Sequence, residues 1–331
     1  MEHPKMEIGI MYRREYPPEG LAAFARRAEQ LGFAEILVVE DAFYTSGIAS
    51  AAIALANTER IRVSLGIMPA AVRNPLYTAM EVATLARAYP GRFYPGFGHG
   101  VAGWLRQAGA LPASQMAALE ETALVVGRLL DGVRVDFDGM HVHLRDCQLL
   151  LPPTQRPPIS LGVIGPKGMQ AAGRSADGVI LSEFASVEYI GWALSQVQAA
   201  RAAGGKAGLG RVTVLQLASA ASSTSQALDE LRPLVCEALL ATDNDAKLAP
   251  AGLLPLATAL RQTAETEVLT GALKAEIDAA TPRLALAGTR EDWQAGMAAL
   301  STAGVQNLIL TPLPSHGPEI VEAFAHHLGW L

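Results

Sequence analysis

Residues 61–98, IRVSLGIMPAAVRNPLYTAMEVATLARAYPGRFYPGFG, hold two apolar runs separated by a helical pattern. The runs at 61–68 and 93–98 are short and rich in β-branched or aromatic residues, as strands are. The pattern at 75–88 opens with a proline, which is favoured at the first helical position, and ends near Pro90 and Gly91. A strand, a helix and a second strand in this order predict a βαβ unit of a parallel sheet.

The same alternation continues on both sides of this unit. Further helical patterns lie at 20–31, 187–203 and 291–303. Several of the apolar runs are hydrophobic on both faces, as strands covered by helices on both sides must be. Eight strands, each followed by a helix, predict a (β/α)8 TIM barrel. The predicted strands are 7–12, 35–39, 61–68, 93–98, 159–164, 178–182, 211–219 and 306–311.

Two connections are too long for simple crossovers, so we expect insertions after strands four and seven. The insertion at 99–158 contains a helical pattern at 112–130 and an alternating segment at 133–144, which predicts a hairpin around Asp138 and Gly139. The insertion at 220–287 contains helical patterns at 225–241, 245–260 and 263–279. Because no linker or shift in composition interrupts the chain, we expect one barrel domain over 1–331.

The composition excludes several classes of protein. Half of the residues are hydrophobic (50%), yet polar residues interrupt every apolar stretch before the roughly 18 residues needed to cross a bilayer. A net charge of −6 with scattered Lys and Arg argues against a nucleic-acid partner. The first residues form no signal-peptide core, which predicts a cytoplasmic protein without a membrane partner. Cys147 and Cys236 lie far apart, and His141 and His143 lack a third ligand, so neither a disulfide framework nor a metal site is predicted.

In a parallel barrel, function lies at the carboxyl ends of the strands. Strand two ends in Glu40 and Asp41, and a half-buried carboxylate at a barrel mouth can exchange protons or orient a ligand. Because strand residues alternate, only one of the two should face the barrel axis. His99 follows strand four between two glycines and is the histidine that best suits chemistry or a ring contact.

Two glycine-rich turns also follow strands. Strand five leads into Gly165-Pro166-Lys167-Gly168 before a helix, where free backbone N–H groups and a lysine would suit an anion. A tight turn with a solvated lysine explains the same residues equally well. The GxGxxG pattern starting at Gly98 follows the fourth strand, and no long helix can follow it, which argues against a Rossmann dinucleotide site.

Four blocks of sequence occur in a family-like order: LGIMPAAVRNPLYTAMEVATL (65–85), GRFYPGFGHG (91–100), GPKGMQAAGRSADGVI (165–180), and AGTREDW with AGVQNLIL (287–293 and 303–310). Together they resemble the luciferase-like superfamily of bacterial luciferase and coenzyme F420-dependent reductases. The resemblance implies a barrel that holds a flavin or deazaflavin ring over the strand ends, with its phosphate near Lys167. It also implies a non-proline cis peptide at Gly66-Ile67.

The resemblance implies a set of site residues and leans toward F420 over FMN, because the Gly-Pro-Lys turn looks like that of the deazaflavin reductases. Asp41 and His99 are the predicted catalytic residues. The protein would supply binding and orientation, and the cofactor would supply the redox chemistry. The predicted cofactor-binding residues are Glu40, Gly66, Ile67, Met68, Gly98, Gly165, Pro166, Lys167, Gly168, Met169 and Ser182.

Two departures from the family pattern bear on the substrate. Val101 stands where deazaflavin sugar-phosphate dehydrogenases have an acid, and Asp41 stands where many relatives have a histidine. These departures disfavour a glucose 6-phosphate dehydrogenase. The predicted mouth, with Tyr12, Phe43, Val101 and Trp104, suits a bulky and mostly apolar small-molecule substrate.

Two alternatives stay open at this point. The first is an FMN-dependent monooxygenase that receives reduced flavin from a partner reductase. The second is a non-catalytic barrel that binds flavin, made conceivable by the missing acid at Val101. A homodimer is the expected assembly in each case.

Overall fold

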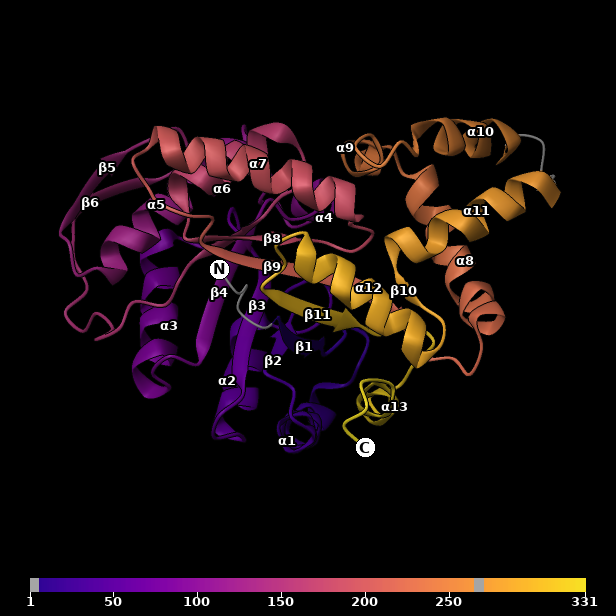
Figure 1. Ribbon diagram of the computed structural model, residues 1–331. Helices are drawn as coiled ribbons and strands as arrows, with labels where there is room; N and C mark the ends of the chain where they lie inside the picture. The colour runs from indigo at the N-terminus through magenta and orange to yellow at the C-terminus, as the bar shows by residue number, and fades with distance from the viewer. Residues whose placement is uncertain (1–5, 265–270) are drawn as a thin grey trace.

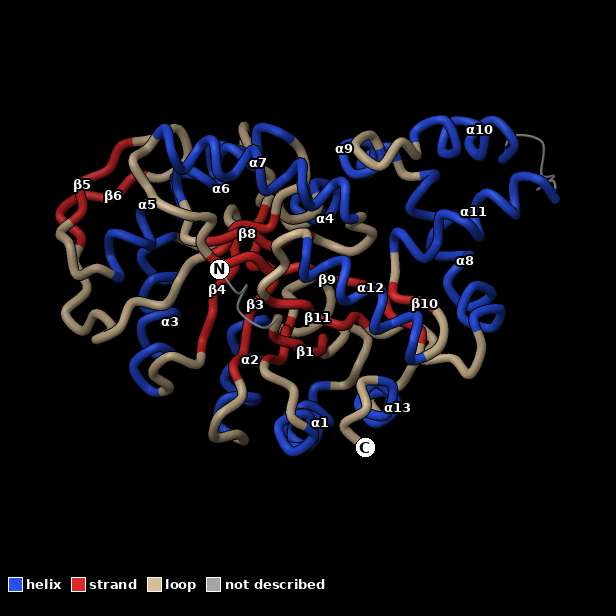
Figure 2. The backbone as a smooth tube through the Cα atoms, viewed as in Figure 1, coloured by secondary structure: helices blue, strands red, loops and turns tan. Residues whose placement is uncertain are grey.

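The computed structural model describes residues 6–264 and 271–331, and its centre is a closed barrel of eight parallel strands (Figures 1 and 2). The hydrogen-bonded order is β1-β2-β3-β4-β7-β8-β9-β11, and β11 pairs with β1 to close the ring. The (β/α)8 prediction is therefore confirmed, and all eight predicted strands are present. They are β1 (Glu7–Met11), β2 (Glu35–Val38), β3 (Arg62–Pro69), β4 (Phe93–Gly98), β7 (Ser160–Gly162), β8 (Gly178–Leu181), β9 (Arg211–Ser219) and β11 (Asn307–Thr311).

The helices around the barrel begin and end where local chemistry favours it. In α1, the apolar positions Leu21, Phe24, Ala28 and Leu31 recur at helical spacing and are buried, and Gly32 ends the helix with φ of 98°. The covering helices are α1 (Leu21–Leu31), α2 (Gly47–Ala56), α3 (Pro75–Ala88), α6 (Pro166–Ser175), α7 (Val187–Ala203), α12 (Arg290–Thr302) and α13 (Ile320–His327).

The insertion after β4 contains the predicted helix and hairpin. The short helix α4 (Ala102–Gln107) precedes α5 (Gln115–Leu130), and the antiparallel strands β5 (Val135–Asp138) and β6 (His143–Cys147) follow. The hairpin turn is held by Glu121 of α5, whose carboxylate accepts hydrogen bonds from three successive backbone N–H groups, at residues 140, 141 and 142. A carboxylate that accepts several backbone donors fixes a turn firmly.

The insertion after β9 is helical, as predicted, and lies at the opposite side of the barrel from the hairpin (Figure 1). The single helix predicted at 245–260 is wrong, because the chain turns at Pro250 and Gly252, the latter with φ of 68°. The pattern predicted at 263–279 falls partly outside the described residues, and the described helix there begins at Gly271. The elements are α8 (Thr224–Leu240), the 3-10 turn η2 (Thr242–Asn244), α9 (Asp245–Leu248), α10 (Leu254–Ala264), α11 (Gly271–Leu284) and the short strand β10 (Leu286–Ala287), which pairs with β9.

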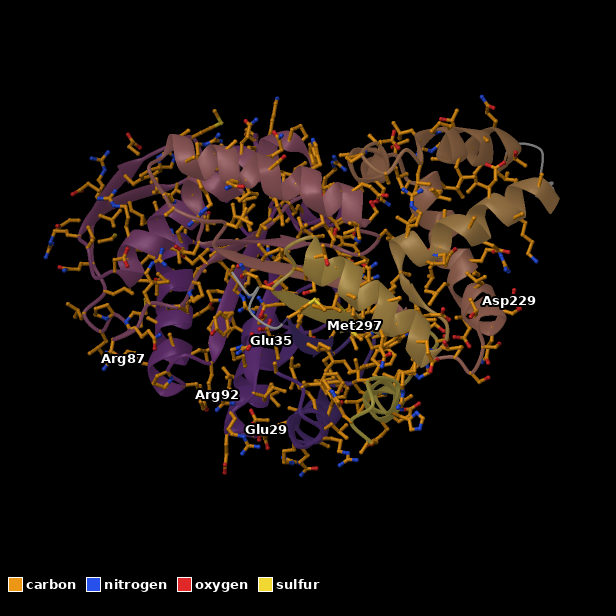
Figure 3. All side chains as sticks on the ribbon, viewed as in Figure 1. Glu29, Glu35, Arg87, Arg92, Asp229 and Met297 are labelled. Atoms are coloured by element: carbon orange, nitrogen blue, oxygen red, sulfur yellow. The ribbon has the colours of Figure 1, made fainter. Side chains whose placement is uncertain are left out.

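Buried charges close the amino end of the barrel. Glu35 of β2, labelled in Figure 3, is 1% exposed and accepts hydrogen bonds from Ser64 and Arg211. Arg62 Nε lies 3.5 Å from the same carboxylate, and both guanidinium groups lie over the ring of Tyr94. These contacts satisfy the buried acid. No helix among the described residues is long and apolar enough to cross a membrane.

Candidate active site

A cavity of about 590 Å³ opens at the carboxyl ends of the barrel strands. Residues from β1, β2, β3, β7, β8, β9 and β11 or from the loops after them line it, together with residues of α8 and η2. Its volume lies in the range typical of small-molecule sites. The polar residues that line it from the strand ends are Arg13, Arg14, Glu15, Asp41, Ser182, Glu183 and Thr311.

The floor of this central cavity is apolar. Met11, Ile180 and Leu215 form part of a buried cluster inside the barrel, and Val39 and Ile67 pack against it. These side chains come from the inward-facing positions of their strands, as the alternation of strand residues requires. A flat apolar ligand would therefore find a hydrophobic surface above the barrel interior.

The end of β3 has an unusual backbone. The Gly66-Ile67 peptide bond is cis, as the family resemblance implies, and the register with β4 shifts between Leu65 and Met68. A Cβ atom at Gly98 would lie 2.7 Å from the Ile67 side chain, and one at Gly162 would lie 2.5 Å from it. Glycine at both positions therefore leaves room for Ile67 at the cavity. Met68 is buried in the barrel core and does not line the cavity.

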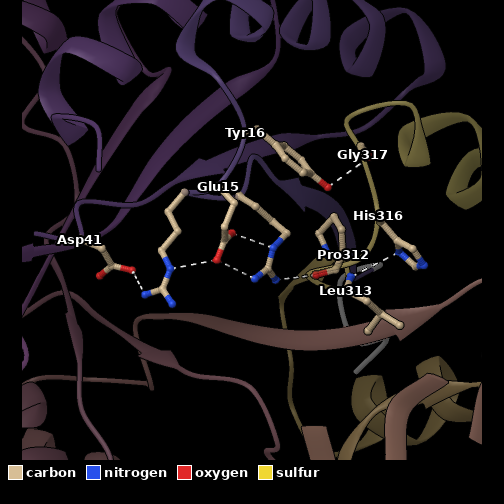
Figure 4. Close-up of polar contacts among 9 residues, drawn as sticks. Glu15, Tyr16, Asp41, Pro312, Leu313, His316 and Gly317 are labelled. Atoms are coloured by element: carbon tan, nitrogen blue, oxygen red, sulfur yellow. Dashed lines mark hydrogen bonds and ion pairs between the residues drawn. The ribbon is translucent and has the colours of Figure 1, made fainter. Parts of the chain in front are cut away.

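A chain of ion pairs crosses the mouth of the cavity (Figure 4). Arg14 Nη1 donates to Asp41 Oδ2 at 2.8 Å, and Arg14 Nε donates to Glu15 at 3.0 Å. Arg13 also binds Glu15 and donates to the backbone oxygen of Pro312 at 2.7 Å. Burial opposes the charge of Arg14, but its hydrogen bonds to the two carboxylates outweigh burial and raise its pKa. The ion pair with Arg14 thus holds Asp41 at the cavity.

Glu40 lies elsewhere, although it is the neighbour of Asp41. Its carboxylate binds the guanidinium of Arg73 and accepts a hydrogen bond from the backbone N–H of Gly47 at 2.9 Å. Gly47 is the first residue of α2, so Glu40 fixes the beginning of that helix. Glu40 is not among the residues lining the cavity, so the structure gives it a structural position.

Aromatic side chains lie beside the ion pairs. Phe43 is 73% exposed and its ring meets that of Trp104 edge to face at 6.3 Å. The guanidinium of Arg14 lies over the rings of Tyr44 and Trp104, at 5.0 and 5.6 Å. Val101 is also exposed. The three aromatic residues and Val101 form a rim next to the cavity. None of these four residues is part of the cavity lining, whereas Arg14 is.

Tyr12 is not at the predicted mouth. It is 5% exposed, packs in the core beside Tyr16 and Phe24, and donates its hydroxyl to the backbone oxygen of Pro17 at 2.6 Å. Burial, aided by the nearby charge of Glu19, raises the pKa of Tyr12 to about 12. The prediction that Tyr12 contacts substrate is therefore at odds with the structure. Met11 faces the cavity, so the next residue along the strand faces away from it.

His99 is half-buried and lies outside the cavity lining. Its Nδ1 lies 3.2 Å from the backbone oxygen of Gln115, and the Gln115 amide donates back to the His99 oxygen at 3.2 Å. Because a carbonyl oxygen only accepts, we assign the hydrogen to Nδ1 and a free lone pair to Nε2. Burial lowers the pKa of His99, while the hydrogen bond with Gln115 opposes this shift, so the net effect favours the neutral ring.

Two hydroxyl groups at the cavity are buried without a hydrogen-bond partner among the described residues. They are Ser182 Oγ, which follows β8, and Thr311 Oγ1, at the end of β11. Next to Ser182, Glu183 and Phe184 also line the cavity, and Phe184 has φ of 64°. Lys247 of α9 is buried and donates Nζ to the backbone oxygen of Glu183 at 2.9 Å, which ties the helical insertion to this segment.

The predicted phosphate turn is placed at the start of α6. Gly165 precedes the helix in an extended conformation, Pro166 is its first residue, and Lys167 is exposed in its first turn. Gly168 packs against Val163, and Met169 is fully buried. Residues 162–164, directly before the turn, line the central cavity, so the amino end of α6 adjoins it.

Sequence reasoning missed several residues of the cavity. Arg13 and Arg14 follow β1, and Glu183 and Phe184 follow β8. The same strand-end rule that selected Asp41 would have found these four. The insertion residues Glu237 and Asn244 line the cavity too, and they carry no local signal.

The chain is an α/β barrel with a cavity at the carboxyl ends of its strands, which is where such barrels carry their sites. A model of the luciferase-like monooxygenase family matches residues 6–307, so the chain belongs to that family. An F420-dependent glucose-6-phosphate dehydrogenase of Microbacterium testaceum is 29% identical over 178 residues, 50% of this chain and 53% of the relative. The chain thus spans about half the length of the curated relatives it matches.

Solved structures cover nearly the whole chain. The coenzyme F420-dependent tetrahydromethanopterin reductase of Methanopyrus kandleri superposes with a TM-score of 0.79 over 98% of each chain at 19% identity. The oxygenating constituent of 3,6-diketocamphane monooxygenase of Pseudomonas putida, in complex with FMN, superposes with a TM-score of 0.70 over 98% of this chain and 96% of that one, at 15% identity. At these identities the likeness shows the shared barrel fold.

Proposed function

We propose that the protein is an oxidoreductase that transfers a hydride between coenzyme F420 and a bulky, mostly apolar organic substrate. The proposal rests mainly on the apolar floor of the 590 Å³ cavity. This floor surrounds Ile67, which follows the cis peptide bond of β3. The F420-dependent relatives named above support the choice of cofactor.

The residues at the cavity fit a flat ring with a polar edge. Ile67, Ile180 and Leu215 offer apolar surface, while the hydroxyls of Ser182 and Thr311, which have no partner within the described part of the chain, would turn to bind polar ring atoms. When bound, F420 supplies the hydride chemistry, and the protein supplies position and electrostatics.

The chain's own polar groups have distinct parts in this proposal. Arg14 holds Asp41 at the cavity through Oδ2, where Asp41 would exchange the proton that accompanies the hydride, accepting it when the substrate is oxidised and returning it when the substrate is reduced. The exposed rim with Phe43 and Trp104 would cover an apolar substrate and exclude water. His99 as a second catalytic residue stays a prediction, because its ring lies outside the cavity lining.

The second candidate function is an FMN-dependent monooxygenase fed with reduced flavin by a partner reductase. The observation that favours it is the shared barrel with the FMN complex from Pseudomonas putida. Titration of the purified protein with F420 and with FMN, followed by fluorescence, tests both candidates. We expect a micromolar Kd for F420 and at least tenfold weaker binding of FMN.

Turnover measurements with reduced F420 test whether the protein is an enzyme and whether it uses oxygen. Reduced F420 should be oxidised in the presence of apolar carbonyl or enone acceptors with and without oxygen alike. Preferred FMN binding with oxygen uptake would establish the monooxygenase instead. Binding of F420 without turnover of any acceptor would leave a non-catalytic flavin-binding barrel.

Lys167 supplies a local test of the cofactor's orientation. Since it lies in the first turn of α6, beside the cavity, we expect it to meet the cofactor phosphate. A charged hydrogen bond contributes about 1.5–3 kcal/mol, so Lys167→Ala should raise the F420 Kd roughly 10- to 100-fold. The exposed Arg174, in the last turn of the same helix, gives the matched control, Arg174→Ala. Equal Kd values for the two variants would place the phosphate elsewhere.

A further inference from the structure

A second cavity lies on the outside of the barrel wall. It has a volume of about 200 Å³ and is lined by residues of β9, β10, α12, the beginning of α7 and the end of α11. Leu215 and Leu217 of β9 line the central cavity, whereas Gln216 between them lines this outer cavity. Because strand side chains alternate, the barrel wall itself separates the two sites.

The floor of the outer cavity contains one buried polar side chain in an apolar setting. Gln216 is 2% exposed, and its Oε1 is buried without a hydrogen-bond partner in residues 6–264 and 271–331. The buried neighbours in the lining are Ala285, Leu286 and Leu300. An acceptor buried in this way is costly unless something donates to it.

The rim of the outer cavity carries no net charge. Arg283 Nη2 donates to Glu188 Oε1 at 2.8 Å and to the backbone oxygen of Ala251 at 2.7 Å. These two rim residues therefore satisfy each other's charge. A charged ligand would lose its hydration in the cavity without meeting a free counter-charge, which disfavours both anions and cations.

The size and the lining of the outer cavity restrict further which ligands can bind there. A buried water needs two to four polar partners, and the floor around Gln216 is otherwise built of Ala and Leu side chains. An apolar cavity of about 150 Å³ is enough to bind benzene, so 200 Å³ accommodates about seven non-hydrogen atoms. We propose that the outer cavity binds a small, neutral aliphatic molecule whose single N–H or O–H group donates to Gln216 Oε1, with the side-chain amide turning its oxygen toward the cavity to meet the ligand.

A pair of probes tests the hydrogen bond. 3-Methylbutanamide and 4-methylpentan-2-one have the same branched shape and number of heavy atoms, but only the amide has an N–H donor. In a ligand-observed NMR titration we expect the amide to bind with a Kd on the order of 1 mM. The ketone should bind at least fivefold more weakly. In Gln216→Leu, which removes the acceptor and keeps the volume, this preference should vanish.

A second pair of variants tests the location. Ala299 of α12 lines the rim, and its exposed neighbour Ala298 lies outside the lining. Ala299→Leu should abolish amide binding, and Ala298→Leu should leave it unchanged. The proposal is overturned by equal binding of amide and ketone to the wild-type protein, by amide binding that survives Ala299→Leu, or by a crystal soaked with the amide that shows only water beside Gln216.

Discussion

The two ends of the barrel treat buried polar groups in opposite ways. At the amino end, the buried carboxylate of Glu35 is bound by Ser64 and Arg211. At the carboxyl end, the hydroxyls of Ser182 and Thr311 are buried without a partner among the described residues, and both residues line the central cavity. The buried carboxylate at the amino end is therefore satisfied within the fold, whereas the two hydroxyls at the carboxyl end are not, although Asn307 Oδ1 at the amino end is also buried without a partner in the described residues.

The largest expected effect lies at the amino end. Glu35→Ala leaves Arg211 and Arg62 without their buried counter-charge, and breaking a buried pair in this way costs about 3–5 kcal/mol. Urea unfolding at pH 7 measures the loss. Glu7→Ala is the matched control, because Glu7 pairs with Arg62 but is exposed, and surface pairs contribute about 0–1 kcal/mol.

The cofactor affinity of the same variant completes this test. The folded fraction of Glu35→Ala should bind F420 as the wild-type protein does, since the whole barrel separates the two ends. A large loss of affinity at full folding would show that the ends are coupled, and the comparison would then fail.

The second largest expected effect distinguishes the roles of two neighbouring acids at the carboxyl end, Glu40 and Asp41. Asp41→Asn should lower kcat roughly 10- to 100-fold and leave the F420 Kd within about twofold, because Asp41 lines the cavity. Glu40→Gln should instead lower stability by about 1–3 kcal/mol, since Glu40 binds Arg73 and the start of α2. Steady-state kinetics and unfolding of both variants decide the matter, and reversed results would exchange the two roles.

Much of the fold could be predicted from the sequence, because its signals are local. Strands buried on both faces are continuously apolar, and Pro75 and Gly32 mark helix ends through their own backbone preferences. The helix predicted at 245–260 failed because its apolar pattern continues across Pro250, where the chain turns. Hydrophobic spacing alone does not register a turn of this kind.

The candidate site was predictable only in part. The strand-end rule found Asp41, and the family resemblance added Ile67 and Ser182; all three line the cavity. Arg14 also follows a strand, but its ion pair with Asp41, 27 residues away, has no local signal, and Arg-Arg-Glu by itself is typical of a solvated loop. Glu237 comes to the cavity only through the packing of a helical insertion, and no local pattern encodes that packing.

A buried lysine shows how the region near the carboxyl end treats a charged group. Lys247, near the carboxyl end, donates to a backbone oxygen, and burial lowers its pKa to about 8, against the opposing charge of Glu183. The native protein then binds fewer protons than the unfolded chain between pH 8 and the ordinary lysine value of 10.5. Stability should therefore rise with pH in this window, by up to about 1.4 kcal/mol per pH unit.

Urea unfolding between pH 7 and 9.5 shows whether Lys247 causes that rise. Lys247→Met should remove it, and Lys274→Met, at an exposed site of α11, should keep it. If the stability of both variants rises equally with pH, Lys247 does not cause the rise. Its charge is then compensated by its surroundings as well as that of Arg211 is at the amino end. The distinction between paired and unpaired charge would then disappear.

The smallest expected effect is the most direct probe of the unpaired hydroxyls. Ser182→Ala removes a buried oxygen that has no partner in the described structure, so the free energy of unfolding should change by less than about 0.5 kcal/mol or increase. If Ser182 binds the cofactor, the F420 Kd should rise roughly 2- to 10-fold, the value of one neutral hydrogen bond. Ser64→Ala at the amino end should show the reverse, with stability lowered by about 1–3 kcal/mol and affinity unchanged, because its hydroxyl donates to buried Glu35. A Ser182→Ala protein that is clearly less stable and binds F420 normally would mean that this hydroxyl serves the fold, and that the two ends of the barrel do not differ in the way proposed.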